Sequence, residues 1–409
     1  MPTDPSVVAE QAGMIAAAWS PADAPASWAL TAAQFEALRD DSELLALAAT
    51  IPADRLPPLL FTAAATFLVL ERSPAPLRNW FPRLGEPQPP VDGRFKDAYR
   101  RFCLDHRDRL LALCAEHRYQ MNEVGRCAEL LPALAPAIDD GRPLVLVDIG
   151  TGAGLALQLD RYRYVFDGPG ARRSTVGEER ASVVIETEVR GSRAVPLARA
   201  PPRIAEPIGI DIEPLDLGDG GVRDWLYACI PQEIGAVNRF HGAAQVALEH
   251  PARMVRGDAC AVLPEVLASI PDDAIVCLID SYVHVFFEPA ELRRFRALVD
   301  EAGASRDLDW ISLDPLVPMG DAATDTVIGV PAPSALLERQ RRGAVFGALA
   351  RGQLPRRRAV GGRPRARPSR RRVDRVAMSG RGRSVPFAMW IRAAGRSRSM
   401  TPRGSWSKT

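Results

Sequence analysis

The stretch Leu144-Val-Leu-Val-Asp-Ile-Gly-Thr-Gly-Ala-Gly154 decides the fold. Its first six residues form an apolar run broken only by Asp148, as a strand buried on both faces of a parallel sheet requires. Three glycines at alternate positions follow, and they let the backbone turn sharply and approach a ligand closely. A helix that begins behind them would direct its N–H groups at that ligand. The stretch therefore predicts a strand, a ligand-binding loop and a helix.

Strand and helix patterns alternate after this stretch. Further strands are predicted at residues 208–212, 254–256, 274–279 and 308–313, with helices between them, for example at 235–249 and 289–302. This alternation is typical of an α/β fold with a Rossmann-like, doubly wound and mostly parallel sheet. We assign residues 138–350 to this domain. An insertion at about 160–207 contains the alternating run 183–190 and a turn at 190–193, which together predict a β-hairpin.

Residues 1–137 show helical patterns and predict an α-helical N-terminal domain. Asp41-Ser42 predicts a helix cap, a long helical pattern covers 95–117, and a further helix is predicted to begin near Asn122. The long pattern contains two Cys-x-x-His pairs that begin at Cys103 and Cys114. On one helix the pairs would lie about 16 Å apart, too far to share a zinc ion. We therefore expect no metal site.

Acidic residues follow the predicted strands where a ligand would lie. Asp211 and Glu213 end the second strand, Asp258 follows the third, and Asp280 ends the fourth. In open α/β sheets, ligands bind outside the carboxyl ends of the strands, where the strand order reverses. A carboxylate there can accept hydrogen bonds from both hydroxyls of a ribose. The alternative is that each is an ordinary solvated loop carboxylate.

The spacing Asp-x-Gly-x-Gly-x-Gly resembles motif I of class I S-adenosylmethionine-dependent methyltransferases. A dinucleotide fingerprint would need a glycine where Leu155 stands. The resemblance implies S-adenosylmethionine as the cofactor. It also implies that Asp258 lies near the adenine amino group and that Asp280 faces the methyl acceptor. The residues assigned to the cofactor are Asp148, Gly150, Gly152, Gly154, Asp211, Glu213 and Asp258.

A second resemblance covers roughly residues 30–350. The stretches 102–107, 120–127, 150–164 and 209–216 are similar to a bacterial family called domain of unknown function 2332. This resemblance implies the same Rossmann-like domain behind a helical region. It brings no established activity.

Five residues are candidates for the reaction itself. Asn122 and Arg126 would share one face of a helix that covers the ligand, with Glu123 between them; a solvated helix start is the alternative. Asp280 ends the fourth strand, and His284 is a candidate general base. A histidine among apolar neighbours is also common as a core residue. The candidates for catalysis are Asp280, His284, Asn122, Glu123 and Arg126.

The last part of the chain differs in composition. Residues 351–409 hold 18 basic residues and one acidic residue, so the charge is about +17 there and about −15 before it. Their Arg, Pro, Gly and Ser content predicts disorder, with no strand of the sheet after Arg351. Either a non-specific nucleic-acid-binding arm or translation out of frame in a GC-rich gene would give this composition.

Taken together, these patterns predict a cytoplasmic protein. The N-terminus has no signal-peptide pattern, and the longest uncharged stretch, 56–70, is too short to span a bilayer. Six cysteines without a Cys-x-x-Cys pair indicate reduced thiols. The expected activity is methyl transfer from S-adenosylmethionine to an unknown small-molecule or macromolecular acceptor. The alternatives are a non-catalytic adenosylmethionine- or nucleotide-binding module and a protein that binds nucleic acid through its tail.

Overall fold

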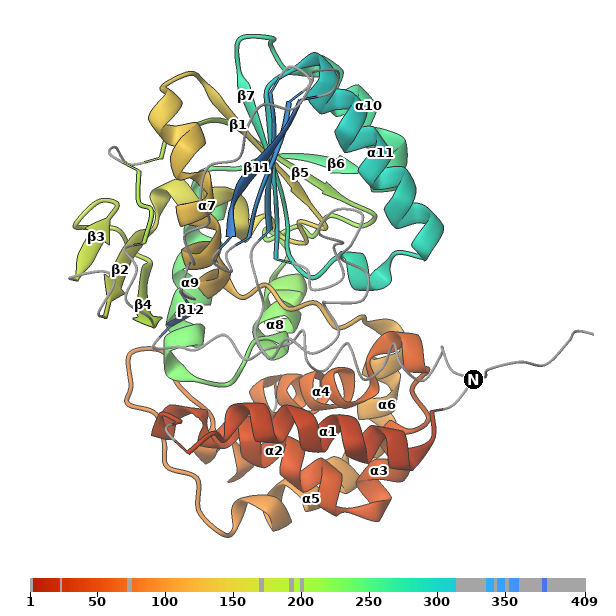
Figure 1. Cartoon of the computed structure of the whole chain (residues 1–409). Coiled ribbons are helices and arrows are strands. Elements are labelled where there is room, and N and C mark those ends of the chain that lie inside the picture. The colour runs from red at the N-terminus through yellow and green to blue at the C-terminus, as the bar shows by residue number, and fades with distance from the viewer. Residues whose placement is uncertain are drawn as a thin grey trace, which may run out of the picture. The chain divides into compact units, whose positions relative to one another are not determined.

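A computed structural model of the chain describes residues 3–22, 24–71, 76–168, 173–190, 195–198 and 202–313, and the backbone of four later strands (Figure 1). The chain divides into two compact units. Among the described residues, the first unit comprises 3–119 and 231–233. The second comprises 120–230, 234–313 and the later strands. No helix of the described residues is long and apolar enough to cross a membrane.

The first unit is helical, as predicted. Its centre is α4, in which all but three residues are buried. Asp41 caps α3 by accepting hydrogen bonds from the N–H groups of Glu43 and Leu44, so the predicted cap is confirmed. The long helix predicted over 95–117 is wrong, because the chain breaks at His106 into two helices. The helices are α1 (Pro5–Trp19), α2 (Ala29–Asp40), α3 (Ser42–Ala48), α4 (Pro57–Glu71), α5 (Phe95–Asp105) and α6 (Arg107–Glu116), with short 3₁₀ helices η1 (Ala26–Trp28), η2 (Ala53–Arg55) and η3 (Pro76–Trp80).

The second unit contains the predicted parallel sheet. Its five parallel strands lie in the order β8-β7-β1-β5-β6, so the central strand β1 is where the order reverses. Every residue of β1 and β7 is buried, as expected for strands covered on both faces. The five strands are β1 (Leu144–Ile149), β5 (Ile204–Asp211), β6 (Arg253–Arg256), β7 (Ile275–Asp280) and β8 (Leu308–Ser312).

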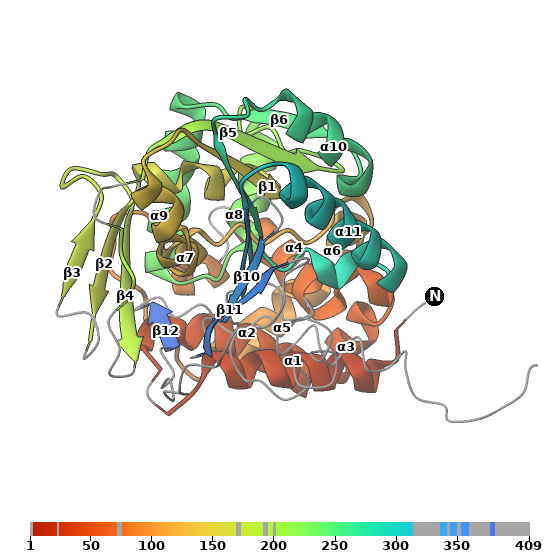
Figure 2. The ribbon, with the colours of Figure 1, turned by 45° about the horizontal axis from the view of Figure 1, so that its top comes forward.

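Alternate residues of the central strands enter two different cores. Leu144 and Leu146 of β1 belong to one buried cluster with α7 (Cys127–Asp140), α8 (Gly220–Cys229) and α9 (Ile234–Glu249). Val145 and Val147 belong to a second cluster with α10 (Ala259–Ser269) and α11 (Pro289–Ser305). Figures 1 and 2 show α7 and α9 on one side of the sheet and α10 and α11 on the other. The sheet is therefore doubly wound.

The boundary between the units lies between Tyr119 and Gln120, earlier than the predicted position near residue 137. The reason is that α7 packs on the sheet. Its residues Leu130, Leu131 and Leu134 are buried in the same cluster as Leu144.

The insertion forms a small second sheet. It contains β2 (Arg163–Asp167), β3 (Ser174–Val176) and β4 (Val184–Arg190). The strand predicted over 183–190 is confirmed as β4, and the insertion contains an antiparallel hairpin pair. The hairpin pair is β2 with β3, whereas β4 lies parallel to β2. This pairing sets Tyr164 beside Ile185 and buries both side chains in one core. Residues 191–193 of the predicted turn lie outside the described residues.

Four later strands are described by their backbone. The strands β9 (Leu336–Arg341), β10 (Ala344–Leu349) and β11 (Gln353–Ala359) extend the large sheet beyond β8 by antiparallel pairing. The expectation that no strand of this sheet follows Arg351 is therefore wrong for β11. In addition, β12 (Ala377–Gly380) pairs with β4. The rest of the predicted tail, 360–376 and 381–409, lies outside the described residues.

Candidate functional site

The predicted glycine loop lies at the carboxyl end of β1, the central strand of the sheet. Gly150, Gly152 and Gly154 have positive φ values of +69°, +56° and +73°. L-residues with a side chain rarely adopt this left-handed conformation, so the structure favours glycine at all three positions.

The glycine loop is fixed to the end of the neighbouring strand β5. The N–H groups of Gly150 and Thr151 donate to the carbonyl oxygen of Ile210, at 2.8 and 3.2 Å. The N–H of Gly152 donates to Oδ2 of Asp211 at 2.9 Å. The loop and the acidic end of β5 therefore form one hydrogen-bonded unit.

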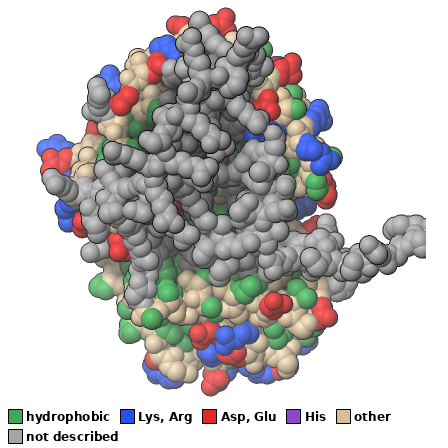
Figure 3. All heavy atoms as spheres, viewed as in Figure 1, with side chains coloured by type: hydrophobic (Ala, Val, Ile, Leu, Met, Phe, Trp, Pro, Cys, Tyr) green, Lys and Arg blue, Asp and Glu red, His purple; other side chains and the backbone are tan. Residues whose placement is uncertain are grey.

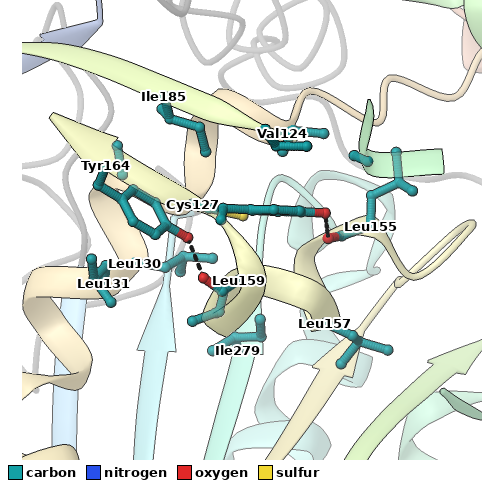
Figure 4. Close-up of a cluster of buried hydrophobic side chains, with 14 of the residues drawn as sticks. Val124, Cys127, Leu130, Leu131, Leu155, Leu157, Leu159, Tyr164, Ile185 and Ile279 are labelled. Carbon is teal, nitrogen blue, oxygen red and sulfur yellow. Dashed lines mark hydrogen bonds between the residues drawn. The ribbon is translucent and has the colours of Figure 1, made fainter. Parts of the chain in front are cut away.

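The segment after the loop is a short 3₁₀ helix, η5 (Leu155–Arg161), which is kinked at Gln158. A helix therefore begins behind the glycines, as predicted, but it is a 3₁₀ helix and not an α-helix. One reason lies in two buried tyrosines. The hydroxyl of Tyr162 donates to the Leu155 carbonyl at 2.6 Å, and that of Tyr164 donates to the Leu159 carbonyl at 2.7 Å (Figure 4). These carbonyls are thereby satisfied outside an α-helical ladder.

Three of the predicted acidic residues lie at the same edge of the sheet. Asp211 is half-buried, and its Oδ1 accepts a hydrogen bond from the N–H of Glu213 at 2.9 Å. The Glu213 side chain is exposed. Asp258 is also exposed and caps α10 by accepting from the N–H of Ala261 at 3.0 Å. Because the N–H of Gly257 donates to the Asp211 carbonyl at 2.9 Å, the ends of β5 and β6 are held together.

The residues before α7 lie against the glycine loop. Asn122 Oδ1 accepts from the N–H of Ala153 at 3.4 Å. A Cβ atom placed on Gly152 would lie 2.8 Å from the same oxygen. The prediction that Asn122 and Arg126 share one face of a helix is wrong. Asn122 precedes the 3₁₀ helix η4 (Val124–Arg126), and α7 begins only at Cys127. Asn122 nevertheless covers the loop.

Glu123 forms hydrogen bonds and an ion pair inside the protein. Its Oε1 accepts from the N–H of Gly125 at 2.8 Å and from Nε and an Nη of Arg239 at 3.2 and 3.0 Å. The side chains of the ion pair are only 8% and 11% exposed. Glu123 therefore neutralises a buried arginine, and its carboxylate is already engaged.

Arg126 lies next to the end of β7. Its guanidinium carbon is 4.6 Å from the centre of the Tyr282 ring, a cation–π contact. Tyr282 has a φ of +59°, a strained value for a bulky residue. The next residue, Val283, covers the loop, because a Cβ placed on Gly150 would lie 2.5 Å from Val283 Cγ2.

Asp280 and His284 are fully buried rather than exposed at the ligand edge. The Asp280 carboxylate accepts hydrogen bonds from Trp310 Nε1 at 2.6 Å and from the Ser312 hydroxyl. His284 Nε2 lies 3.5 Å from Asp280 Oδ2. Burial raises the pKa of Asp280 to about 7, so this carboxyl can hold a proton at neutral pH. The ring of His284 also lies against the rings of Phe295 and Trp310.

Asp148 is the second buried carboxyl at this edge. It is 5% exposed. Burial raises its pKa to about 7, and the negative charges of Asp280 and Asp211 add to the effect. Register places the last residue of β1 beside Asp280 and Ile210, so the three strand ends are level.

Comparison with protein families gives a match. Residues 17–363 match the model of a family described as "Uncharacterized protein conserved in bacteria (DUF2332)". The chain belongs to the DUF2332 family. The resemblance stated from the sequence is thereby confirmed. A search of the curated proteins gave no match.

The DUF2332 fold also uses residues that sequence reasoning missed. The Glu123 carboxylate accepts a hydrogen bond from Arg239, and the Asp280 carboxylate accepts hydrogen bonds from Trp310 and Ser312. No motif spacing in the sequence could pair residues that lie so far apart in the chain. The positive φ of Tyr282 likewise has no signal in the sequence. No group of three or more His, Cys, Asp or Glu residues in the described part of the chain is placed to hold a metal ion.

Proposed function

We propose that the second unit binds S-adenosylmethionine at the glycine loop and transfers its methyl group to an acceptor that the residues do not identify. One observation carries this proposal. Three left-handed glycines lie at the carboxyl end of the central strand, where the strand order reverses, and they are hydrogen-bonded to the acidic end of β5. Ligands bind at this point in open α/β sheets.

The glycines alone do not require a ligand. The space of a side chain on Gly150 and Gly152 is taken by Val283 and Asn122. Close packing inside the protein therefore explains why Gly150 and Gly152 have no side chain. The proposal of a nucleoside ligand depends on Asp211. Each oxygen of this carboxylate accepts one backbone N–H, and each has a further lone pair for a ribose hydroxyl.

The proposed residues would do three things. Asp211, with the exposed Glu213 and Asp258 beside it, would orient the adenosine part. Asn122 and Val283 would cover the loop and exclude water. The bound sulfonium supplies an electrophilic methyl group, so transfer depends mostly on positioning and desolvation. A base is needed only for a protonated acceptor, and the buried pair of Asp280 and His284 would take that proton.

A non-catalytic adenosylmethionine-binding module is the second candidate. The observation that favours it is the complete burial of Asp280 and His284, which leaves these two candidate catalytic groups enclosed. Nucleic-acid binding depends on the tail after Arg351, of which only the backbone of β11 and β12 is described. On the face shown in Figure 3, Lys and Arg side chains of the described residues lie among Asp and Glu side chains rather than in a basic stripe.

Titration calorimetry of the purified chain tests the proposal. S-adenosylmethionine and S-adenosylhomocysteine should bind at micromolar concentration, and NAD should not. Binding of NAD alone would overturn the proposal. Incubation of a bacterial extract with the protein and methyl-labelled S-adenosylmethionine then separates the two candidates. Label in an extract component supports methyl transfer, whereas binding without transfer supports the non-catalytic module.

A further inference from the structure

Arg126 is a cationic side chain near the end of β7. It is half-buried at the end of η4, and its guanidinium lies over the Tyr282 ring. Its positive charge also acts on the carboxyl of Asp148 and opposes the effect of burial on the pKa of that group. Arg126 therefore lies close to the ends of β1 and β7, the two strands between which the strand order reverses.

Two carboxylates in this part of the site are engaged by other donors. Glu123 pairs with Arg239. Asp280 accepts from Trp310 and Ser312. Among the described residues, no carboxylate lies within 4.0 Å of a nitrogen of Arg126. The guanidinium is thus held by an aromatic face and keeps its N–H donors for another partner.

The segment that bears Arg126 is anchored. Asn122 lies on the loop at Gly152, and the buried pair of Glu123 and Arg239 fixes the start of η4. The cation–π contact with Tyr282 restricts the guanidinium further. A planar fork of N–H groups fixed in this way suits a carboxylate, which it can bind through two parallel hydrogen bonds.

We propose that Arg126 binds the α-carboxylate of the methionine part of S-adenosylmethionine. This inference rests on the proposed function, because it names the group that holds one end of that ligand. Asp211 and Arg126 would then bind the two ends of the ligand across the glycine loop, the ribose at β5 and the carboxylate beside β7. The role of Arg126 is ligand binding rather than acid–base catalysis.

A matched pair of ligands tests the inference by calorimetry. Decarboxylated S-adenosylmethionine lacks only the carboxylate of S-adenosylmethionine. Arg126→Gln should weaken binding of S-adenosylmethionine about 10- to 100-fold, the usual loss for a hydrogen-bonded charge pair, and should change binding of the decarboxylated form less than about twofold. Arg126→Lys should retain part of the affinity, because it keeps the charge but not the fork. Arg180→Gln, at an exposed arginine before β4, is the control and should leave both affinities unchanged.

Each other outcome overturns the assignment. An equal loss for both ligands in Arg126→Gln would mean that Arg126 supports the fold of the site and does not bind the carboxylate. Unchanged affinity for both would place the carboxylate elsewhere and leave the proposed function standing. If the wild-type chain binds neither ligand, the proposed function fails and the role of Arg126 fails with it. Circular dichroism of Arg126→Gln checks that the variant is folded.

Discussion

Substitution of Gly152 by alanine probes the geometry of the loop directly. The new Cβ atom has two consequences. The residue must keep a φ of +56°, which costs an L-residue roughly 1–2 kcal/mol. The Cβ would also lie 2.8 Å from Asn122 Oδ1, so the Asn122 side chain must move and give up its hydrogen bond to Ala153, which is worth about 0.5–1.5 kcal/mol. We expect Gly152→Ala to lower the free energy of unfolding by roughly 1.5–3.5 kcal/mol.

A double-mutant cycle separates the two costs. In an Asn122→Ala background the contact is absent, so Gly152→Ala should cost only the strain of roughly 1–2 kcal/mol. Gly154→Ala is the matched control, because its φ is +73° but the nearest atom to its Cβ, Leu157 Cδ1, lies at an ordinary 3.5 Å. That variant should cost the strain alone in both backgrounds.

Urea unfolding of the five variants and the wild type, compared at constant m value, measures the cycle. A coupling energy of about 0.5–1.5 kcal/mol between positions 122 and 152 agrees with the geometry. Coupling below about 0.3 kcal/mol would refute the contact between Asn122 and the loop. A cost for Gly154→Ala near zero would refute the left-handed conformation.

Three further predictions concern the carboxylates. The pKa of Asp148 is raised to about 7 from 3.8, so between these pH values the folded state binds more protons than the unfolded state, and the stability of the wild type falls as the pH rises. Asp148→Asn removes this titration, so urea unfolding between pH 4 and 8 should show the variant becoming more stable relative to the wild type, by up to about 4 kcal/mol at the upper end. A stability difference that does not change with pH would contradict this prediction. Asp211→Ala should weaken calorimetric binding of S-adenosylmethionine by roughly 1–3 kcal/mol, whereas Asp41→Ala, which removes a cap in the first unit, should not. Glu123→Gln should destabilise the chain by about 3–5 kcal/mol, because it leaves the Arg239 charge buried without its partner. The double variant Glu123→Gln with Arg239→Met should recover most of the lost stability. If it recovers none, Glu123 stabilises the chain through another contact.

The sequence predicted the parallel sheet because the signals are local. The apolar run at 144–149 and the glycines behind it specify a buried strand and a left-handed loop without reference to distant residues. The engagement of Glu123 by Arg239 depends on contacts across 116 positions of the chain, so no local pattern could predict it. The burial of Asp280 depends likewise on Trp310 and Ser312, 30 and 32 positions away.

The insertion shows the same limit. Alternation at 183–190 predicts a strand, but it does not name the partner strand. One partner is β2, where Tyr164 and Ile185 share a buried core that forms only when the chain is folded. The 3₁₀ form of η5 has a similar origin, since the tyrosine hydroxyls that bond its carbonyls follow it in the chain.

A crystal structure of the chain grown with S-adenosylhomocysteine tests the central claim most directly. The ligand should lie across Gly150–Gly154 at the carboxyl end of β1, with the ribose hydroxyls donating to the Asp211 carboxylate. Electron density for the ligand at another site, or a complex in which the ribose hydroxyls do not contact Asp211 or Glu213, would contradict the assignment of this edge of the sheet to S-adenosylmethionine.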